Sequence, residues 1–209
     1  MYTCAFCHLE SCEEEDPEKY PDNCPCLEER GIGAAKAFYD EFDNKEIAHA
    51  AAVVEASGYC KLTRLEEIMA FAKKMGYQKL GIAFCIGLKK ETQILSQILK
   101  HNGFQVDSVA CKNSHIPKEY IGVIEEEKIE PGTYETMCNP IGQALFLNKA
   151  GTELNLIMGL CVGHDTLFIR YSKAPVTVFA AKDRVLGHNP MAAIYLADSY
   201  YKNKLFTEK

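Results

Sequence analysis

The chain has 209 residues, of which 47% are hydrophobic, and a formal net charge of -6 at pH 7. This composition suits one sizeable core with a small appended segment rather than two full domains, and the scattered Lys and Arg form no basic patch for a nucleic acid. The longest apolar runs have the length of a β-strand, and none approaches the ~20 residues of a membrane span. We therefore expect neither a nucleic acid nor a membrane among the partners.

The ten cysteines are the most unusual feature of the composition. The residues from Met1 to Cys4 have neither the basic nor the apolar region of a secretory signal, so we expect the protein in the cytoplasm. Disulfides are rare in that reducing compartment. Metal ligation or redox chemistry is therefore the leading explanation for the cysteines.

Residues 1–30 differ in kind from the rest of the chain. They hold an acidic run at 13–16, three prolines and little apolar periodicity, together with five cysteines: Cys4, Cys7, Cys12, Cys24 and Cys26. Such a segment cannot build a core alone, and its order is expected to come from a bound metal. We therefore predict a metal-binding segment over residues 1–30 and an α/β domain over residues 31–209.

Helical patterns come first in the predicted domain. Ala-rich residues from 33 to 56 predict one long or two short helices. A further helix is predicted over 63–74, where Thr63 and Glu66 form a capping box and Gly76 ends the helix.

Beyond residue 78, short apolar runs alternate with helical patterns. Strands are predicted at 79–84, 104–110, 154–160 and 176–181, and helices at 90–101, 140–148, 164–171 and 190–202. This alternation is typical of parallel strands joined by right-handed crossovers. The sequence therefore predicts a three-layer, Rossmann-like α/β domain with a mainly parallel sheet, in which residues 112–134 are the least regular stretch.

The N-terminal cysteines have spacings that suit a metal. Cys4 and Cys7 are close enough along the chain to bind one ion through a short turn, and Cys24 and Cys26 can complete a tetrahedral site. His8 offers a nitrogen in place of one sulfur. A structural zinc ion and a redox cluster both use four such ligands, so both alternatives stay open.

The other five cysteines form a second candidate set. Cys85, Cys111 and Cys161 each follow a predicted strand, and the carboxyl ends of parallel strands share the edge of the sheet where ligands bind. Cys138 and Cys60 each precede a predicted helix, where a thiolate is favoured. We expect these five to form a shared thiolate site, although free cysteines also pack well in cores.

Two other polar residues are candidates for proton transfer at this edge. His164 follows Cys161 closely and is either a functional group or part of a helix cap. Lys182 begins the polar loop Lys182–Pro190 after the last predicted strand, which is either an anion-binding or proton-moving loop or a plain connection into a helix. We nominate His164 and Lys182 as catalytic residues.

Several blocks of the sequence resemble a known prokaryotic family. They are Gly58–Arg64, Gly81–Cys85, Cys138–Pro140, Gly159–Asp165 and Lys182–Pro190. Together they are similar to the DUF1847 family, whose members are described as predicted metal-binding proteins. The resemblance spans nearly the whole chain and implies metal binding without naming a reaction.

Three functional hypotheses follow. The first is an iron-sulfur protein, with a 4Fe-4S cluster at the sheet edge, that acts on a small-molecule substrate or a redox partner through redox or lyase/desulfurase-type chemistry. The second is a zinc-binding structural or metal-handling protein without catalysis. The third is a thiol redox enzyme, in which the sheet-edge cysteines serve as nucleophile and resolving pair and one of them has a low pKa.

Overall fold

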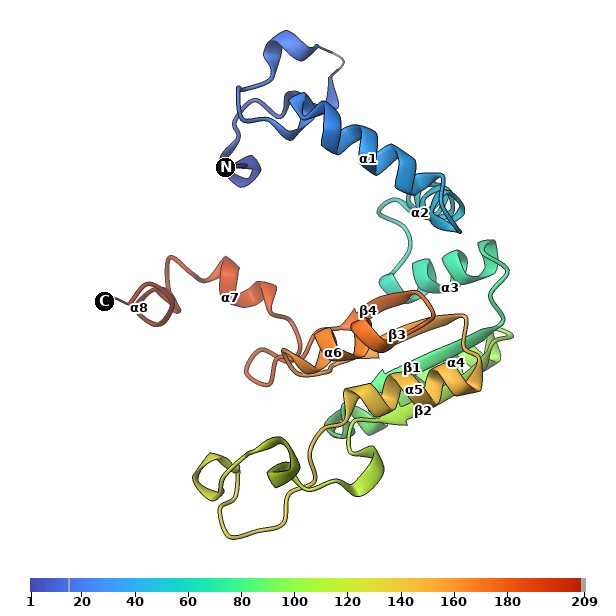
Figure 1. The fold of residues 1–209 in the computed structure, drawn as a ribbon, viewed down its shortest axis with the longest axis vertical. Helices are drawn as coiled ribbons and strands as arrows, with labels where there is room; N and C mark the ends of the chain where they lie inside the picture. Colours follow the sequence, from blue (N-terminus) through green and yellow to red (C-terminus); the bar gives the residue numbers. More distant parts are fainter. Residues whose placement is uncertain (15, 208–209) are drawn as a thin grey trace. The chain divides into compact units, whose positions relative to one another are not determined.

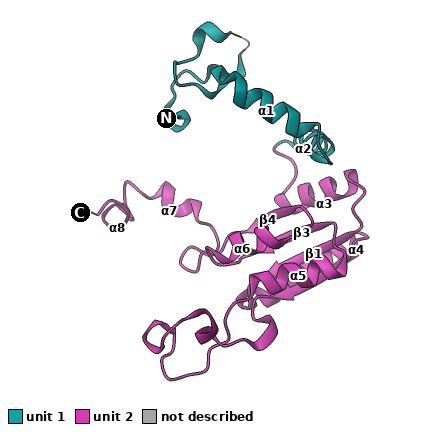
Figure 2. Ribbon diagram, in the orientation of Figure 1, with its two compact units in different colours: residues 1–59 teal, residues 60–209 magenta. Residues whose placement is uncertain are grey.

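The computed structural model describes residues 1–14 and 16–207. The chain divides into two compact units, Met1–Tyr59 and Cys60–Lys209, which are coloured separately in Figure 2. The boundary predicted from composition, at residue 30, falls at the start of the first long helix of the first unit.

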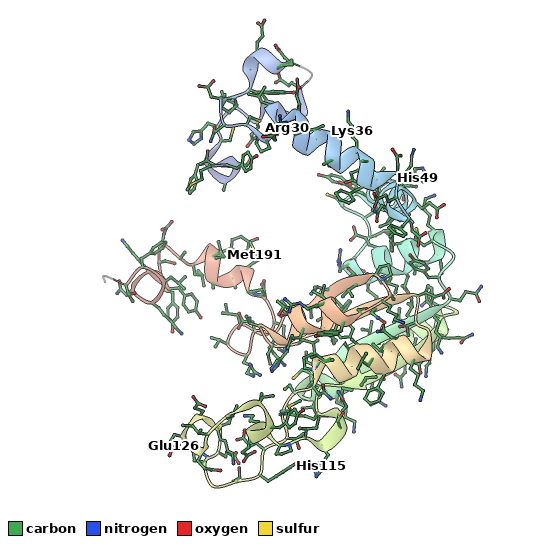
Figure 3. All side chains as sticks on the ribbon, in the orientation of Figure 1. Arg30, Lys36, His49, His115, Glu126 and Met191 are labelled. Atoms are coloured by element: carbon green, nitrogen blue, oxygen red, sulfur yellow. The ribbon has the colours of Figure 1, made fainter. Side chains whose placement is uncertain are left out.

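The first unit begins with four single turns of 3-10 helix and continues with two α-helices. The turns are Cys4–Phe6, Ser11–Glu13, Pro17–Lys19 and Pro25–Leu27. The helices are α1 (Glu29–Tyr39), which carries Arg30 and Lys36, and α2 (Asn44–Gly58), which carries His49 (Figure 3). Of the predicted alternatives, two helices are therefore correct. Few apolar side chains are buried in this unit, chiefly Ala50 and Val54 on α2.

The second unit is built on a four-stranded sheet (Figure 1). Its strands are β1 (Lys79–Phe84), β2 (Gln105–Ala110), β3 (Leu154–Met158) and β4 (Val176–Ala180). The strand order is β2-β1-β3-β4, and every pair of neighbours is parallel. The prediction of a mainly parallel sheet is confirmed.

Helices cover both faces of this sheet because alternate residues of each strand point to opposite faces. On one face, Leu80, Ile82 and Phe84 of β1 pack with α3 (Arg64–Lys74) and α4 (Lys89–His101). On the other face, Ala83 and Cys85 pack with α5 (Pro140–Ala150) and α6 (His164–Tyr171). The unit is therefore a three-layer, Rossmann-like α/β domain, as the sequence predicted.

The start of α3 follows the predicted pattern in detail. The Thr63 hydroxyl accepts a hydrogen bond from the Glu66 backbone N–H, and the Glu66 carboxylate accepts one from the Thr63 backbone N–H. This reciprocal capping box satisfies N–H groups that have no partner within the helix. Beyond the other end, Gly76 has a φ of +73°, which glycine adopts without strain.

An irregular excursion joins β2 to α5. It contains the 3-10 turns Asn113–His115, Lys118–Ile121 and Glu125–Glu127, and carries the side chains of His115 and Glu126 drawn in Figure 3. Salt bridges hold it together, since Lys128 pairs with both Glu119 and Glu125 while its own side chain is 3% exposed. This stretch is as irregular as the sequence predicted.

The prediction of one final helix over 190–202 is wrong. Two short helices occur instead, α7 (Met191–Tyr195) and α8 (Lys202–Leu205), and turns separate them. Ile194 and Tyr195 are mostly exposed, so no core packs against an apolar face to extend the helix. Among the described residues, no helix is long and apolar enough to cross a membrane.

Candidate functional site

The candidate site lies where the strand order reverses. The chain passes from β1 to its neighbour β2, and then returns through α5 to β3 on the other side of β1. In open α/β sheets a crevice forms beyond the carboxyl ends of the strands at such a switch point. Cys85 directly follows β1, Cys111 directly follows β2, and Cys161 follows β3 after a turn at Gly159, whose φ is +66°.

Cys111 and Cys138 form a hydrogen-bonded pair at this edge. The two cysteines belong to opposite ends of the excursion between β2 and α5, and the Asn139 backbone N–H donates to the Cys111 carbonyl at 2.7 Å. The Ile86 backbone N–H donates to Cys111 Sγ at 3.3 Å. Cys111 is 3% exposed, whereas Cys138 is only partly buried. The buried thiol is therefore fixed in place, and its partner is open to solvent.

Two asparagines hold the segments that carry this pair. Asn113 Nδ2 donates to the carbonyls of Ala110 (2.9 Å) and Asn139 (3.0 Å). Asn139 Nδ2 donates in turn to Asn113 Oδ1 at 3.1 Å, and Asn139 Oδ1 caps α5 by accepting from the Gly142 N–H at 2.8 Å. A side chain at Gly142 would collide with both amides. The pair is therefore positioned by a network of side-chain and backbone hydrogen bonds.

The surroundings of Cys138 favour its thiolate. Its pKa is lowered to about 4, first by the hydrogen bond from Cys111, next by one from His164, and then by the positive charges of Lys112 and His164. The pKa of Cys111 is strongly raised, first because of its bond to Cys138 and second because of burial. At neutral pH, Cys138 is thus a thiolate and Cys111 is the thiol that donates to it.

The other two sheet-edge cysteines lie beside cationic side chains. Arg184 Nη2 donates to Cys161 Sγ at 3.1 Å, and this bond is the main reason why the pKa of Arg184 is raised. Negative charge on Cys85 or Cys138 raises the pKa of Arg184 further, so its guanidinium lies within electrostatic reach of all three sulfurs. Lys182 approaches the same place, near Gly87 and Gly159.

The structure therefore brings together the four cysteines Cys85, Cys111, Cys138 and Cys161, with His164 and Lys182. Cys60 is different, because it is exposed, and among the described residues no hydrogen bond joins it to the other four. His164 is the first residue of α6, and its side chain bonds to Cys138 instead of capping the helix. No measurement tests the roles predicted for these residues, which stay predictions.

In the first unit, the N-terminal cysteines gather around a shallow cavity of about 360 Å³. Cys4, Cys7 and Cys24 line it, together with His8. Cys26 hydrogen-bonds to Cys24, and its pKa is raised first by that bond and then by burial and by the neighbouring thiols, including Cys12 and Cys4. Cys26 is therefore next to Cys24 and within electrostatic reach of Cys12 and Cys4.

Neither set is a finished metal site. Among residues 1–14 and 16–207, no three His, Cys, Asp or Glu side chains are grouped so that they could hold a metal ion. The donors are of the right chemical type for zinc or an iron-sulfur cluster, but the sulfurs would have to move closer together. We therefore assign no step of the chemistry to a metal.

Three features of the site were missed from the sequence. These are the pairing of Cys111 with Cys138, the contribution of Lys112, and the bond of Arg184 to Cys161. Arg184 belongs to the polar loop Lys182–Pro190, in which only Lys182 was predicted as a site residue. The signal for the pair was present, since one cysteine stands at each end of the irregular stretch.

Comparisons with known proteins place the chain in a family. An uncharacterized protein of Methanocaldococcus jannaschii is 53% identical over 171 residues, which is 82% of this chain and 86% of that protein. No solved structure matches the chain. The model of the family described as "Protein of unknown function (DUF1847)" matches residues 24–179, a range that includes all four sheet-edge cysteines of the site. The chain therefore belongs to the DUF1847 family, as its sequence blocks predicted.

Proposed function

We propose that the sheet edge of the second unit is a thiol-disulfide exchange site, with Cys138 as the attacking thiolate and Cys111 as the resolving thiol. The observation that carries this proposal is the hydrogen-bonded pair itself, in which one sulfur is partly exposed and the other is buried. A thiolate is the nucleophile in such exchange, and the lowered pKa of Cys138 supports its role.

The first step forms a mixed disulfide. Cys138 Sγ attacks one sulfur of a substrate disulfide, a bond forms between the two sulfurs, and the other substrate sulfur leaves as a thiolate that takes up a proton. His164 hydrogen-bonds to Cys138 and is the group placed to pass that proton.

The second step forms a disulfide within the pair. When Cys138 is in the mixed disulfide it no longer carries a charge, so the main cause of the raised pKa of Cys111 is gone. Cys111 loses its proton and attacks Cys138 Sγ. The Cys111–Cys138 bond forms, the bond between Cys138 and the substrate sulfur breaks, and that sulfur leaves as a thiolate that takes up the proton lost by Cys111. The substrate disulfide gains two electrons and the cysteine pair loses two, and an external dithiol restores the pair.

A neutral disulfide tests this proposal. Reduced protein is mixed with 2,2′-dithiodipyridine, and the cysteine-containing peptides are identified by mass spectrometry over time. We expect a Cys111–Cys138 disulfide to form first, a stable mixed disulfide on Cys138 in the Cys111→Ser variant, and no fast reaction at this site in Cys138→Ser. Cys60→Ser is the matched control, because Cys60 is exposed in the same unit. Failure of the wild-type pair to form a disulfide would overturn the proposal.

Metal binding by the N-terminal cysteines is a second candidate function. It is favoured by Cys4, Cys7 and Cys24, which line one cavity, and by Cys26, whose pKa is raised first by its hydrogen bond to Cys24. A bound cation would offset the charge of such thiols when they ionise. Zinc and an iron-sulfur cluster both suit thiolate ligands of this number.

Metal content and the ultraviolet-visible spectrum test the second candidate. Zinc, iron and acid-labile sulfide are measured on anaerobically purified protein, on a Cys24→Ser/Cys26→Ser variant and on Cys111→Ser. We expect a stoichiometric metal that the double variant loses and Cys111→Ser retains. If iron and sulfide are lost with Cys111→Ser instead, the predicted cluster occupies the sheet edge and thiol exchange there is wrong.

A further inference from the structure

Two cations at the sheet edge have no carboxylate partner. Among the described residues, Lys182 and Arg184 form no ion pair, and the only hydrogen bond of the Arg184 side chain goes to Cys161 Sγ. Three lysines of this unit, Lys79, Lys118 and Lys128, do pair with a carboxylate.

The nearest carboxylates of these loops are engaged elsewhere. Asp183 stands between the two cations in sequence, but its Oδ1 accepts from the backbone N–H groups of Val185 (2.9 Å) and Leu186 (2.8 Å). Asp165 accepts from the Thr166 N–H at 2.8 Å. Neither carboxylate pairs with Lys182 or Arg184, so both cations can bind an anion where the strand order reverses, the usual place for a ligand in this type of sheet.

Two glycines lie beside the Lys182 ammonium group. A Cβ built on Gly87, after β1, would lie 4.0 Å from Lys182 Nζ and 3.9 Å from Cys85 Sγ. A Cβ built on Gly159, after β3, would lie 3.9 Å from Lys182 Nζ and only 2.3 Å from Leu88 Cδ1, so no side chain fits there. At Gly87, the lack of a side chain leaves room beside Lys182 Nζ and Cys85 Sγ.

We propose that Lys182 and Arg184 form a binding subsite for an anionic group, a carboxylate or a phosphate, on the substrate of the cysteine pair. This inference rests on the proposed thiol exchange and gives it a substrate class, namely small disulfides that carry a negative charge. Arg184 lies within electrostatic reach of Cys85, Cys138 and Cys161, so an anion held there would bring the rest of its molecule to the reactive sulfur.

Two alkylating agents that differ in charge distinguish anion binding by the subsite from the reactivity of the thiolate. Iodoacetate and iodoacetamide react with the same thiolate, but only iodoacetate is an anion. The rate of each at Cys138 is measured by mass spectrometry of its peptide, and the iodoacetate rate is divided by the iodoacetamide rate. A change in the reactivity of the thiolate alters both rates by the same factor and cancels in this quotient. The quotient therefore reports how strongly the site attracts the negative charge of iodoacetate.

We expect Lys182→Gln and Arg184→Gln each to lower this quotient by roughly threefold to tenfold, since each removes one unit charge that attracts the anion. Lys182→Arg should restore it. Lys100→Gln is the matched control, because Lys100 lies at the end of α4 away from the carboxyl edge of the sheet, and removing its charge should leave the quotient unchanged. High salt should lower the wild-type quotient toward those of Lys182→Gln and Arg184→Gln.

Competition identifies the anion. Inorganic phosphate or acetate is added, and the one that slows iodoacetate at Cys138 more than iodoacetamide shows which group the subsite prefers. If neither competes and neither substitution moves the quotient, the subsite is wrong while thiol exchange stands. If the iodoacetamide rate at Cys138 rises with pH through the range of an ordinary thiol, Cys138 is not a thiolate at neutral pH and thiol exchange is wrong, whatever the quotient does.

Discussion

The two cysteine sets of this chain are held in opposite ways. Beneath the sheet-edge set, Ala83, Ile157 and Phe168 are at most 1% exposed, and the strands fix where each thiol stands. In the described part of residues 1–28, no hydrophobic side chain is buried. Thiols placed by a core can be poised for chemistry before any ligand binds. Thiols without a core need a ligand to become ordered.

Removal of a bound metal should have the largest effect, and it should act on one cysteine set and not on the other. Where the N-terminal cysteines carry a metal, a chelator is expected to unfold residues 1–28 and leave residues 60–209 intact, since structural zinc contributes about 10 kcal/mol or more to such segments. Limited proteolysis with identification of the fragments measures this difference. The Cys24→Ser/Cys26→Ser variant should be cleaved like the chelated protein, and Cys60→Ser like the untreated one. Equal protection of residues 1–28 from proteolysis with and without chelator would contradict the claim that this segment needs a metal to become ordered.

Removing the support beneath the sheet-edge set should have the next largest effect. Phe168 is completely buried in the core between the sheet, α5 and α6, so Phe168→Ala should lower the free energy of unfolding by about 3–5 kcal/mol. Phe146→Ala is the control, because Phe146 is 49% exposed on the neighbouring α5 and its loss should cost less than about 1 kcal/mol. Urea denaturation followed by circular dichroism compares the two. Similar midpoints for both variants would show that the core does not support the edge as described.

The pH dependence of Cys138 tests the site without disturbing the core. Its alkylation by iodoacetamide should stay on a plateau near neutral pH and fall with a midpoint near its pKa of about 4. Cys111→Ala removes a hydrogen bond to a charged group, which contributes about 1.5–3 kcal/mol, so the midpoint should rise by roughly one to two pH units. His164→Ala should raise it less, because its bond is the second cause, and His101→Ala should not move it.

The same titration has a consequence for stability. A thiolate whose pKa is lower in the folded chain contributes stability above its ordinary pKa of about 8.5, and that contribution is lost as the pH falls toward about 4. Cys138→Ser should therefore flatten the pH dependence of the unfolding free energy between these limits. A midpoint for Cys138 alkylation near 8.5 would contradict the thiolate.

Much of the fold could be predicted because it depends on local patterns. The run Lys79–Phe84 is bounded by a helix-ending glycine and a turn, and β1 has those bounds. The position of Cys85, Cys111 and Cys161 at one sheet edge follows from the strand ends alone. The prediction of one final helix failed because helix formation there depends on packing and not on a local pattern. Residues 190–202 have a helical composition but no core against which Ile194 and Tyr195 could pack.

The chemistry within the site could not be predicted in the same way. Cys111 meets Cys138 only because the chain between them returns to its starting point, and that path is fixed by scattered contacts such as those of Lys128 and of the Asn113–Asn139 pair. Such contacts have no periodicity to recognise. The bond from Arg184 to Cys161 likewise depends on how the loop after β4 folds back across the edge.

The smallest expected effect lies at the first helix of the second unit. α3 is capped by the Thr63 side chain, whereas the Asp43 side chain in the corresponding position of α2 makes no cap hydrogen bond. Thr63→Ala should therefore lower the free energy of unfolding of the second unit by about 1 kcal/mol, and Thr63→Ser should restore most of it. Asp43→Ala should change stability by no more than a few tenths of a kcal/mol. Hydrogen exchange of the peptides covering each helix measures both effects. If Asp43→Ala loosens α2 as much as Thr63→Ala loosens α3, the first unit is ordered by local capping after all, and the contrast between the two units applies only to the residues before α1.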